Sequence, residues 1–123
     1  MVKGHINDNL EIKVKLSILS RDSTETEVEA IVDTGFTGDM CLSESLVESV
    51  ELDYVGTKSF ELANGKIEEK EVFLGKIIFD DARQETLFII SESEDTLLGA
   101  NLLKTKELYI NYKKRTAEIS DAV

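Results

Sequence analysis

One carboxylate stands out by its setting in the sequence. Asp33 follows the apolar run Ala30-Ile31-Val32 and precedes Thr34 and Gly35. A carboxylate placed where an apolar strand enters a glycine-containing turn is partly desolvated and rigidly held. The glycine lets backbone amides approach it, and the threonine offers a hydroxyl for a neighbouring hydrogen bond. Taken alone, Asp-Thr-Gly more often marks an ordinary turn, because Asp and Gly are both turn residues.

The other reactive residue types are scarce, which leaves acid–base chemistry to carboxylates. His5 is the only histidine, and we expect it to lie near a mobile end of the chain. A histidine-containing triad and a zinc site built on several histidines are therefore disfavoured. Cys41 is the only cysteine, has no basic residue nearby in the sequence, and is expected to be buried. We predict no metal and no cofactor.

A second motif follows later in the chain. Leu97, Leu98 and Gly99 form an apolar pair with a glycine and lead into Ala100-Asn101-Leu102-Leu103, which could begin a short helix. Taken alone this segment is typical of core packing. Between the two motifs lies Asn64-Gly65, and Asn-Gly flanked by apolar residues is the strongest short signal for a β-hairpin.

The elements that must position these residues are mostly short strands. Apolar and charged residues alternate with the period of two that a half-buried strand shows. Ser43 is a plausible N-cap for a helix. Strands are predicted over Ile12–Ile18, Val28–Val32, Lys76–Phe79, Thr86–Ile90 and Leu108–Tyr112, a hairpin over Phe60–Leu74, and short helices over Glu44–Val50 and Ala100–Lys106. Core positions are predicted at Met40, Leu42, Phe60, Phe73, Phe79 and Phe88.

Composition limits the class of protein. The chain of 123 residues, with 41% hydrophobic and 32% charged residues, fits one globular domain over residues 1–123. Its net charge of -11 disfavours binding to nucleic acid. No apolar run approaches the roughly 20 residues that span a bilayer, so no membrane association is expected. A single cysteine fits a reducing cytoplasm, and Lys113-Lys114-Arg115 is read as a turn between the final strands.

Together, in this order, the motifs resemble those of the retropepsin-like aspartic proteases, and of their non-viral branch in particular. The resemblance covers about residues 28–112. It implies an all-β fold, a small closed acid-protease barrel with one or two short helices, assembled as a twofold dimer. By this resemblance Asp33 is catalytic, and the other positions carry supporting roles. Thr34, Gly35, Leu97, Leu98 and Gly99 support the catalytic loop, and Ala63, Asn64, Gly65 and Lys66 form a flap.

The resemblance also implies a mechanism. One chain brings a single catalytic Asp33, so two chains must meet to supply a pair of carboxylates. The pair shares a proton, and a water activated between the two Asp33 side chains attacks a peptide bond. The expected activity is that of an aspartic endopeptidase acting on a peptide or unfolded protein.

Departures from the family pattern keep alternatives open. Phe36, Thr37 and Gly38 separate Gly35 from Asp39, so we assign no substrate contact to Asp39. One alternative is a catalytically weak or inactive dimerisation or binding module with the same fold. Another is an unrelated small barrel or sandwich in which Asp-Thr-Gly is a coincidence. The sequence does not name the substrate.

Overall fold

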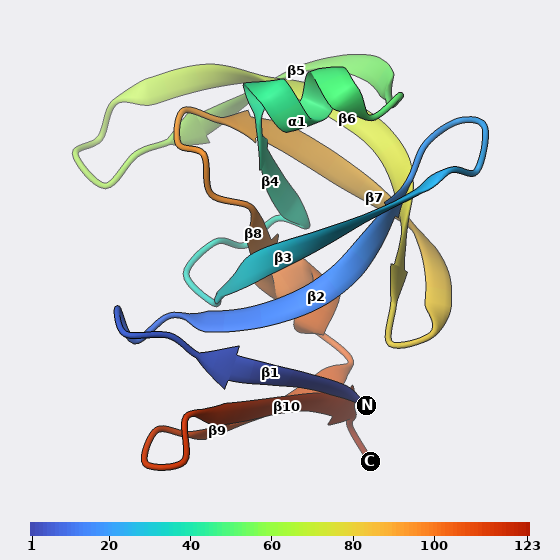
Figure 1. Cartoon of the computed structure of the whole chain (residues 1–123). Coiled ribbons are helices and arrows are strands. Elements are labelled where there is room, and N and C mark those ends of the chain that lie inside the picture. The colour runs from blue at the N-terminus through green and yellow to red at the C-terminus, as the bar shows by residue number, and fades with distance from the viewer.

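The protein is built almost entirely of β-strands, as the computed structural model of residues 1–123 shows (Figure 1). Only one short α-helix and one 3-10 helix interrupt them. In chain order the elements are β1 (Val2–Ile6), β2 (Ile12–Leu19), β3 (Glu25–Asp33), β4 (Met40–Ser43), α1 (Glu44–Ser49), β5 (Asp53–Glu61), β6 (Ile67–Phe79), β7 (Ala82–Ser91), β8 (Leu97–Gly99), η1 (Ala100–Leu103), β9 (Lys106–Asn111) and β10 (Thr116–Asp121).

Six of these strands close into a barrel. Around the ring, β6, β7, β4, β8, β3 and β2 follow one another, and pairing of β2 with β6 closes it. The closing register places Ile18 opposite Ile77, and both side chains are fully buried. Strand β5 pairs only with β6, while β1, β10 and β9 extend the sheet beyond β2. The prediction of an all-β closed barrel is confirmed.

Side chains from the inner face of each strand fill the barrel interior. Alternate residues of a strand point to opposite faces, so every second apolar residue faces inward. The predicted core residues Met40, Leu42, Phe79 and Phe88 are confirmed, with exposures of 0–1%. The prediction for Phe60 and Phe73 needs correction, because both are only partly buried. Phe60 belongs to a separate apolar cluster beneath the β5–β6 hairpin, and Phe73 packs against the core and Tyr54.

The two helices are shorter than predicted. Ser43 caps α1 as expected, its hydroxyl accepting a hydrogen bond from the Leu46 amide at 3.2 Å. The helix ends at Ser49, since Val50 is extended. Residues 100–103 form a 3-10 helix, and Lys106 already belongs to β9, where it pairs with Asp121. None of the helices has the length and apolar character needed to cross a membrane.

The first residues are ordered, contrary to expectation. Strand β1 pairs with both β2 and β10, and His5 lies opposite Lys13 and Thr116. Ile6 is 3% exposed, so this polar-looking segment nonetheless anchors one side chain in the core. At Gly4, an added Cβ would lie 2.8 Å from a methyl of Val14, which shows how closely β1 and β2 approach.

The β5–β6 hairpin is long and reaches beyond the barrel. Its loop is centred on Asn64-Gly65 as predicted, but it has three residues rather than two. The Leu62 amide donates to the Lys66 carbonyl at 2.7 Å, and only Gly65 has a positive φ, of 82°. This is a turn followed by one left-handed residue, a common hairpin form. A bulge interrupts β5 between Tyr54 and Gly56, and Gly56 has a φ of 136°.

The long β6 unites two segments predicted as separate strands. Its first part pairs with β5 in the hairpin, and its second part pairs with β7 and β2 in the barrel. One strand therefore serves both the hairpin and the barrel wall. At the opposite end of the chain, the predicted basic turn is confirmed, because residues 112–115 connect β9 and β10.

Candidate active site

The site lies on the outer face of four neighbouring strands, β3, β8, β4 and β7. Their registers align Val32, Leu98, Met40 and Phe88 in one row that points into the barrel. The rows on either side must therefore point outward. One outward row is apolar and consists of Ile31, Leu97, Cys41 and Ile89. The other, called the site row here, consists of Asp33, Gly99, Asp39 and Leu87.

Asp33 ends β3 and is held by the turn that follows it. Its Oδ1 accepts a hydrogen bond from the Gly35 amide at 3.0 Å, and its carbonyl accepts one from the Phe36 amide at 3.1 Å. The side chain is half-buried, whereas Thr34 is exposed. A Cβ on residue 35 would lie 3.3 Å from Asp33 Oδ1, so glycine leaves the carboxylate its space. The carboxylate is thus oriented while one side stays open.

The second motif lies directly beside the first. Strand β8 runs parallel to β3 and places Gly99 opposite Asp33. The Gly99 amide donates to the Asp39 carbonyl at 2.7 Å, and the Ala100 amide donates to the Phe36 carbonyl at 2.7 Å. An added Cβ at residue 99 would collide with the Gly38 carbonyl and come within 2.7 Å of the Phe36 ring. Gly99 is therefore required by close backbone approach, and Leu98 is buried behind it.

Asp39 fastens the end of the loop of residues 33–39, called the Asp33 loop here. Its Oδ1 accepts a hydrogen bond from Asn101 Nδ2 at 2.6 Å, and its Oδ2 accepts one from the Leu87 amide at 2.9 Å. One carboxylate thereby connects the loop to η1 and to β7. Both oxygens are engaged within the chain, so Asp39 acts here as a structural clamp.

A pocket lies between this face and the hairpin. Its volume is about 290 Å³. The Asp33 loop and β7 form the floor, and Lys58, Phe60 and Val72 of the hairpin form the roof. Asp33 does not line it but lies two strands away along the site row, roughly 10 Å at ordinary strand spacing. The lining residues are Phe36, Thr37, Gly38, Asp39, Met40, Lys58, Phe60, Val72, Leu87, Ile89 and Asn101.

The predicted flap residues occupy the hairpin tip. Ala63, Asn64, Gly65 and Lys66 are all exposed, and none of them lines the pocket. The strands behind the tip cover it instead. Figure 1 shows this tip and the loop between β3 and β4 projecting toward the same side of the molecule.

Cys41 faces the hairpin from the apolar row. Burial raises the pKa of its thiol to about 11, with a smaller rise from nearby Asp33 and an opposing effect of Lys70. The prediction of a buried cysteine is confirmed. The structure contains no cluster of three or more His, Cys, Asp or Glu side chains arranged for a metal ion.

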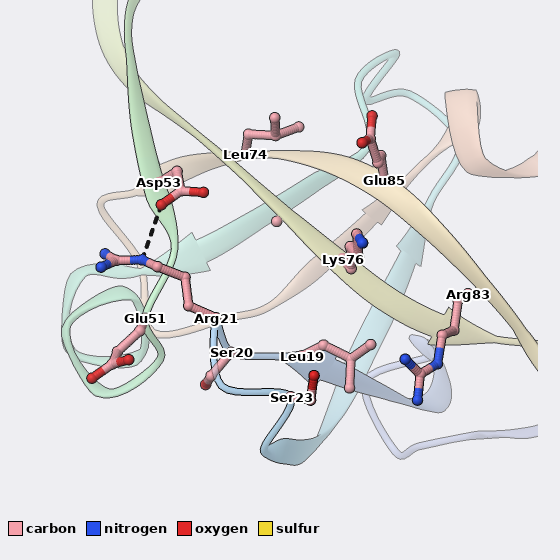
Figure 2. A pocket seen from close by; sticks show the side chains of 11 residues that line it. Leu19, Ser20, Arg21, Ser23, Glu51, Asp53, Leu74, Lys76, Arg83 and Glu85 are labelled. Carbon is pink, nitrogen blue, oxygen red and sulfur yellow. Dashed lines mark ion pairs between the residues drawn. The ribbon is translucent and has the colours of Figure 1, made fainter.

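A second pocket, of about 280 Å³, lies elsewhere on the barrel (Figure 2). Its side chains are mostly polar, with cationic and anionic groups mixed. Arg21 is already occupied, because its Nε pairs with Asp53 at 2.9 Å and its Nη2 donates to the Leu52 carbonyl at 3.0 Å. Figure 2 shows Arg83 far from this pair, so the cations do not converge. We assign the candidate site to the pocket beside the Asp33 loop.

Sequence reasoning missed the clamp and the pocket roof. Asp39 and Asn101 are 62 positions apart, and no local pattern connects them. The pairing of residues in the pocket roof could have been predicted from the sequence. Counting outward from the hairpin centre at Asn64 pairs Lys58 with Lys70, and the structure has that register.

The closed barrel, the glycine-containing loop at the end of β3 and the overlying hairpin define a retropepsin-like aspartic protease fold. Residues 14–102 match the sequence model of the family described as aspartyl protease, and the chain belongs to that family. The crystal structure of a retropepsin-like aspartic protease from Rickettsia conorii is similar, with a TM-score of 0.64 and 16% sequence identity. That similarity covers 94% of this chain and 86% of the other. No curated protein sequence matches.

Proposed function

We propose that two copies of this chain associate about a twofold axis to form an aspartic endopeptidase. The observation that carries the proposal is the setting of Asp33, a half-buried carboxylate fixed by the Gly35 amide at 3.0 Å in the only such loop of the chain. One chain therefore offers half of a two-carboxylate site. A twofold interface would bring the same loop from each chain to the axis.

The chemistry follows from the proximity of the two carboxylates. Two such groups a few ångströms apart cannot both ionise cheaply, so the pair holds one proton and titrates in two coupled steps. The ionised Asp33 would take a proton from a water lying between the pair. The protonated partner would polarise the carbonyl of the peptide bond that the water attacks.

The surrounding residues would take supporting roles. Thr34 is exposed beside Asp33, where it could brace the partner's loop by a hydrogen bond across the axis. The β5–β6 hairpin would close over an extended peptide and exclude water from the reacting bond. Leu97, Leu98 and Gly99 would keep the loop in place from behind. A reducing compartment such as the cytoplasm suits a chain whose single cysteine is buried.

The test combines assembly with cleavage. Sedimentation analysis should find a dimer, and a peptide library should be cleaved with an acid-favoured pH profile. Asp33→Asn should abolish cleavage and leave the circular dichroism spectrum unchanged. Asp81→Asn is the matched control, because Asp81 is exposed in the β6–β7 turn with a φ of 60°, which asparagine adopts readily. It should cleave at the wild-type rate.

Two results would count against the proposal. Cleavage that persists in Asp33→Asn would place the chemistry elsewhere. A dimer that cleaves no peptide between acidic and neutral pH would favour the binding or dimerisation module instead.

A further inference from the structure

The underside of the hairpin carries two lysines that face each other. Register places Lys58 of β5 directly opposite Lys70 of β6, and paired residues lie on the same face of a hairpin. Phe60 and Val72 on the same face line the pocket roof beside Lys58. Lys58 therefore belongs to the surface that covers the cleft, and Lys70 lies beside it on the same face of the hairpin.

Like charges directly opposite on two strands destabilise a hairpin. Only the charge of Lys70 is balanced within the chain, because its Nζ lies 3.5 Å from Glu68 and its side chain is 20% exposed. Lys58 has no ion-pair partner, and its ammonium lies 5.6 Å from the centroid of the Phe60 ring. A carboxylate from outside the chain, bound next to Lys58, would relieve the repulsion.

The rest of the pocket determines how such a carboxylate could lie. Its walls are mainly apolar, with Phe36, Phe60 and Ile89 among them. Asp39, on the floor, is acidic, and both its oxygens accept hydrogen bonds from within the chain. An acidic side chain would therefore be repelled by the floor and attracted by the roof. An apolar side chain fits the pocket, and a carboxylate fits only at the rim under Lys58.

We propose that Lys58, supported by Lys70, selects peptides that carry an acidic side chain within two residues of a large apolar one. The apolar side chain would occupy the pocket, and the neighbouring Asp or Glu would lie under the hairpin. Elsewhere the net charge of -11 repels acidic peptides, so this cationic spot would act as a local filter. The inference rests on the proposed peptidase function and names its substrate class.

The experiment compares matched peptides that differ at one position. Peptides with a fixed large apolar residue carry Glu, Gln or Lys one or two positions away. Wild-type protein should cleave the Glu peptide with a kcat/KM about five-fold above the Gln peptide, equivalent to roughly 1 kcal/mol. Lys58→Gln should reduce that ratio to about one. Raising the salt concentration should also reduce the ratio, because salt screens exposed charges.

Lys113→Gln provides the control for removing one positive charge. Lys113 is exposed in the β9–β10 turn, at the end of the molecule opposite the hairpin (Figure 1), so its ratio should stay at the wild-type value. Equal cleavage of Glu and Gln peptides by wild-type protein would overturn the selectivity and leave the peptidase intact. Equal loss of the ratio in Lys113→Gln would also overturn it, since net charge alone would then explain the effect.

Binding to the Asp33→Asn protein separates this inference from the proposed function. Fluorescence anisotropy should give a Kd for the Glu peptide about five-fold below that of the Gln peptide, and Lys58→Gln should abolish the difference. If no variant cleaves but this difference persists, peptidase function fails and the acidic-peptide site stands. If cleavage occurs without the difference, the site fails alone.

Discussion

The clamp formed by Asp39 allows a quantitative test of how the Asp33 loop is held. Asp39→Ala removes an acceptor used by Asn101 Nδ2 at 2.6 Å and by the Leu87 amide at 2.9 Å. Hydrogen bonds to charged groups contribute about 1.5–3 kcal/mol each, and because these two bonds are exposed we place them at the low end. We expect Asp39→Ala to lower the free energy of unfolding by about 3 kcal/mol, and Asn101→Ala by about 1.5 kcal/mol.

A double-mutant cycle isolates the bond between the two side chains. Urea unfolding followed by circular dichroism should give a coupling energy between Asp39 and Asn101 of about 1–1.5 kcal/mol. Asp8 supplies the control, because it pairs with Arg115 at a similar distance of 2.7 Å while being 98% exposed. Exposed ion pairs contribute little, so Asp8→Ala should leave the unfolding midpoint unchanged. The comparison therefore tests whether the loss of stability depends on where the contact lies in the fold rather than on its length.

The result that refutes this reasoning is specific. A coupling energy below about 0.3 kcal/mol, no larger than the error of such cycles, would show that the side chains do not hold the loop. The backbone bonds from Gly99, Ala100 and Asn101 to the loop would then suffice. If the clamp acts as described, Asp39→Ala should also reduce kcat for the Gln peptide, since the loop that bears Asp33 would lose one anchor.

Two further predictions concern the barrel and its thiol. Phe88 is fully buried, so Phe88→Ala should lower the free energy of unfolding in urea by about 3–5 kcal/mol. The neighbouring Leu87 is 45% exposed, so Leu87→Ala should lower it by less than about 1 kcal/mol. Equal losses would contradict the placement of Phe88 inside the barrel and Leu87 outside it. The Cys41 pKa, raised from 9.0 to about 11, means that native protein should react with iodoacetamide at pH 8 far more slowly than protein in urea. Comparable reaction rates for native and denatured protein would refute the burial of the thiol. Because the Cys41 pKa is higher in the folded protein, the free energy of unfolding should fall between about pH 9 and 11. This fall should be absent in Cys41→Ser.

Local patterns in the sequence predicted a large share of the fold. Alternation located β2 and β3, and apolar runs located parts of β6 and β7, whereas the short barrel strands β4 and β8 were not predicted as strands. Ser43 marked the helix start because N-caps depend on neighbouring residues only. The hairpin centre was found for the same reason. Strand β1 was missed, since Val2–Ile6 is polar and becomes ordered only by pairing with β10, more than a hundred residues away.

The site was predictable where its geometry is local. The Gly35 amide reaches Asp33 within the same turn, so Asp-Thr-Gly carries its own geometry. That Gly99 lies beside Asp33 came from a family resemblance, because parallel pairing of β3 with β8 has no short-range signal. Phe60 was misplaced in the core because an aromatic residue under a hairpin has the same local pattern as one inside a barrel.

The double role of β6 determines where the hairpin can bend. From Val72 onward β6 is bonded to β7 in the barrel wall, whereas residues 67–71 pair with β5 alone. Opposite Val72 lies Gly56, whose φ is 136°, and a bulge breaks the ladder between Gly56 and Tyr54. The part of the hairpin beyond Gly56 and Val72 can therefore bend at its base, and this bending does not require a glycine-rich tip. A rigid tip and a flexible base would let the whole underside of the hairpin close over a peptide as one unit.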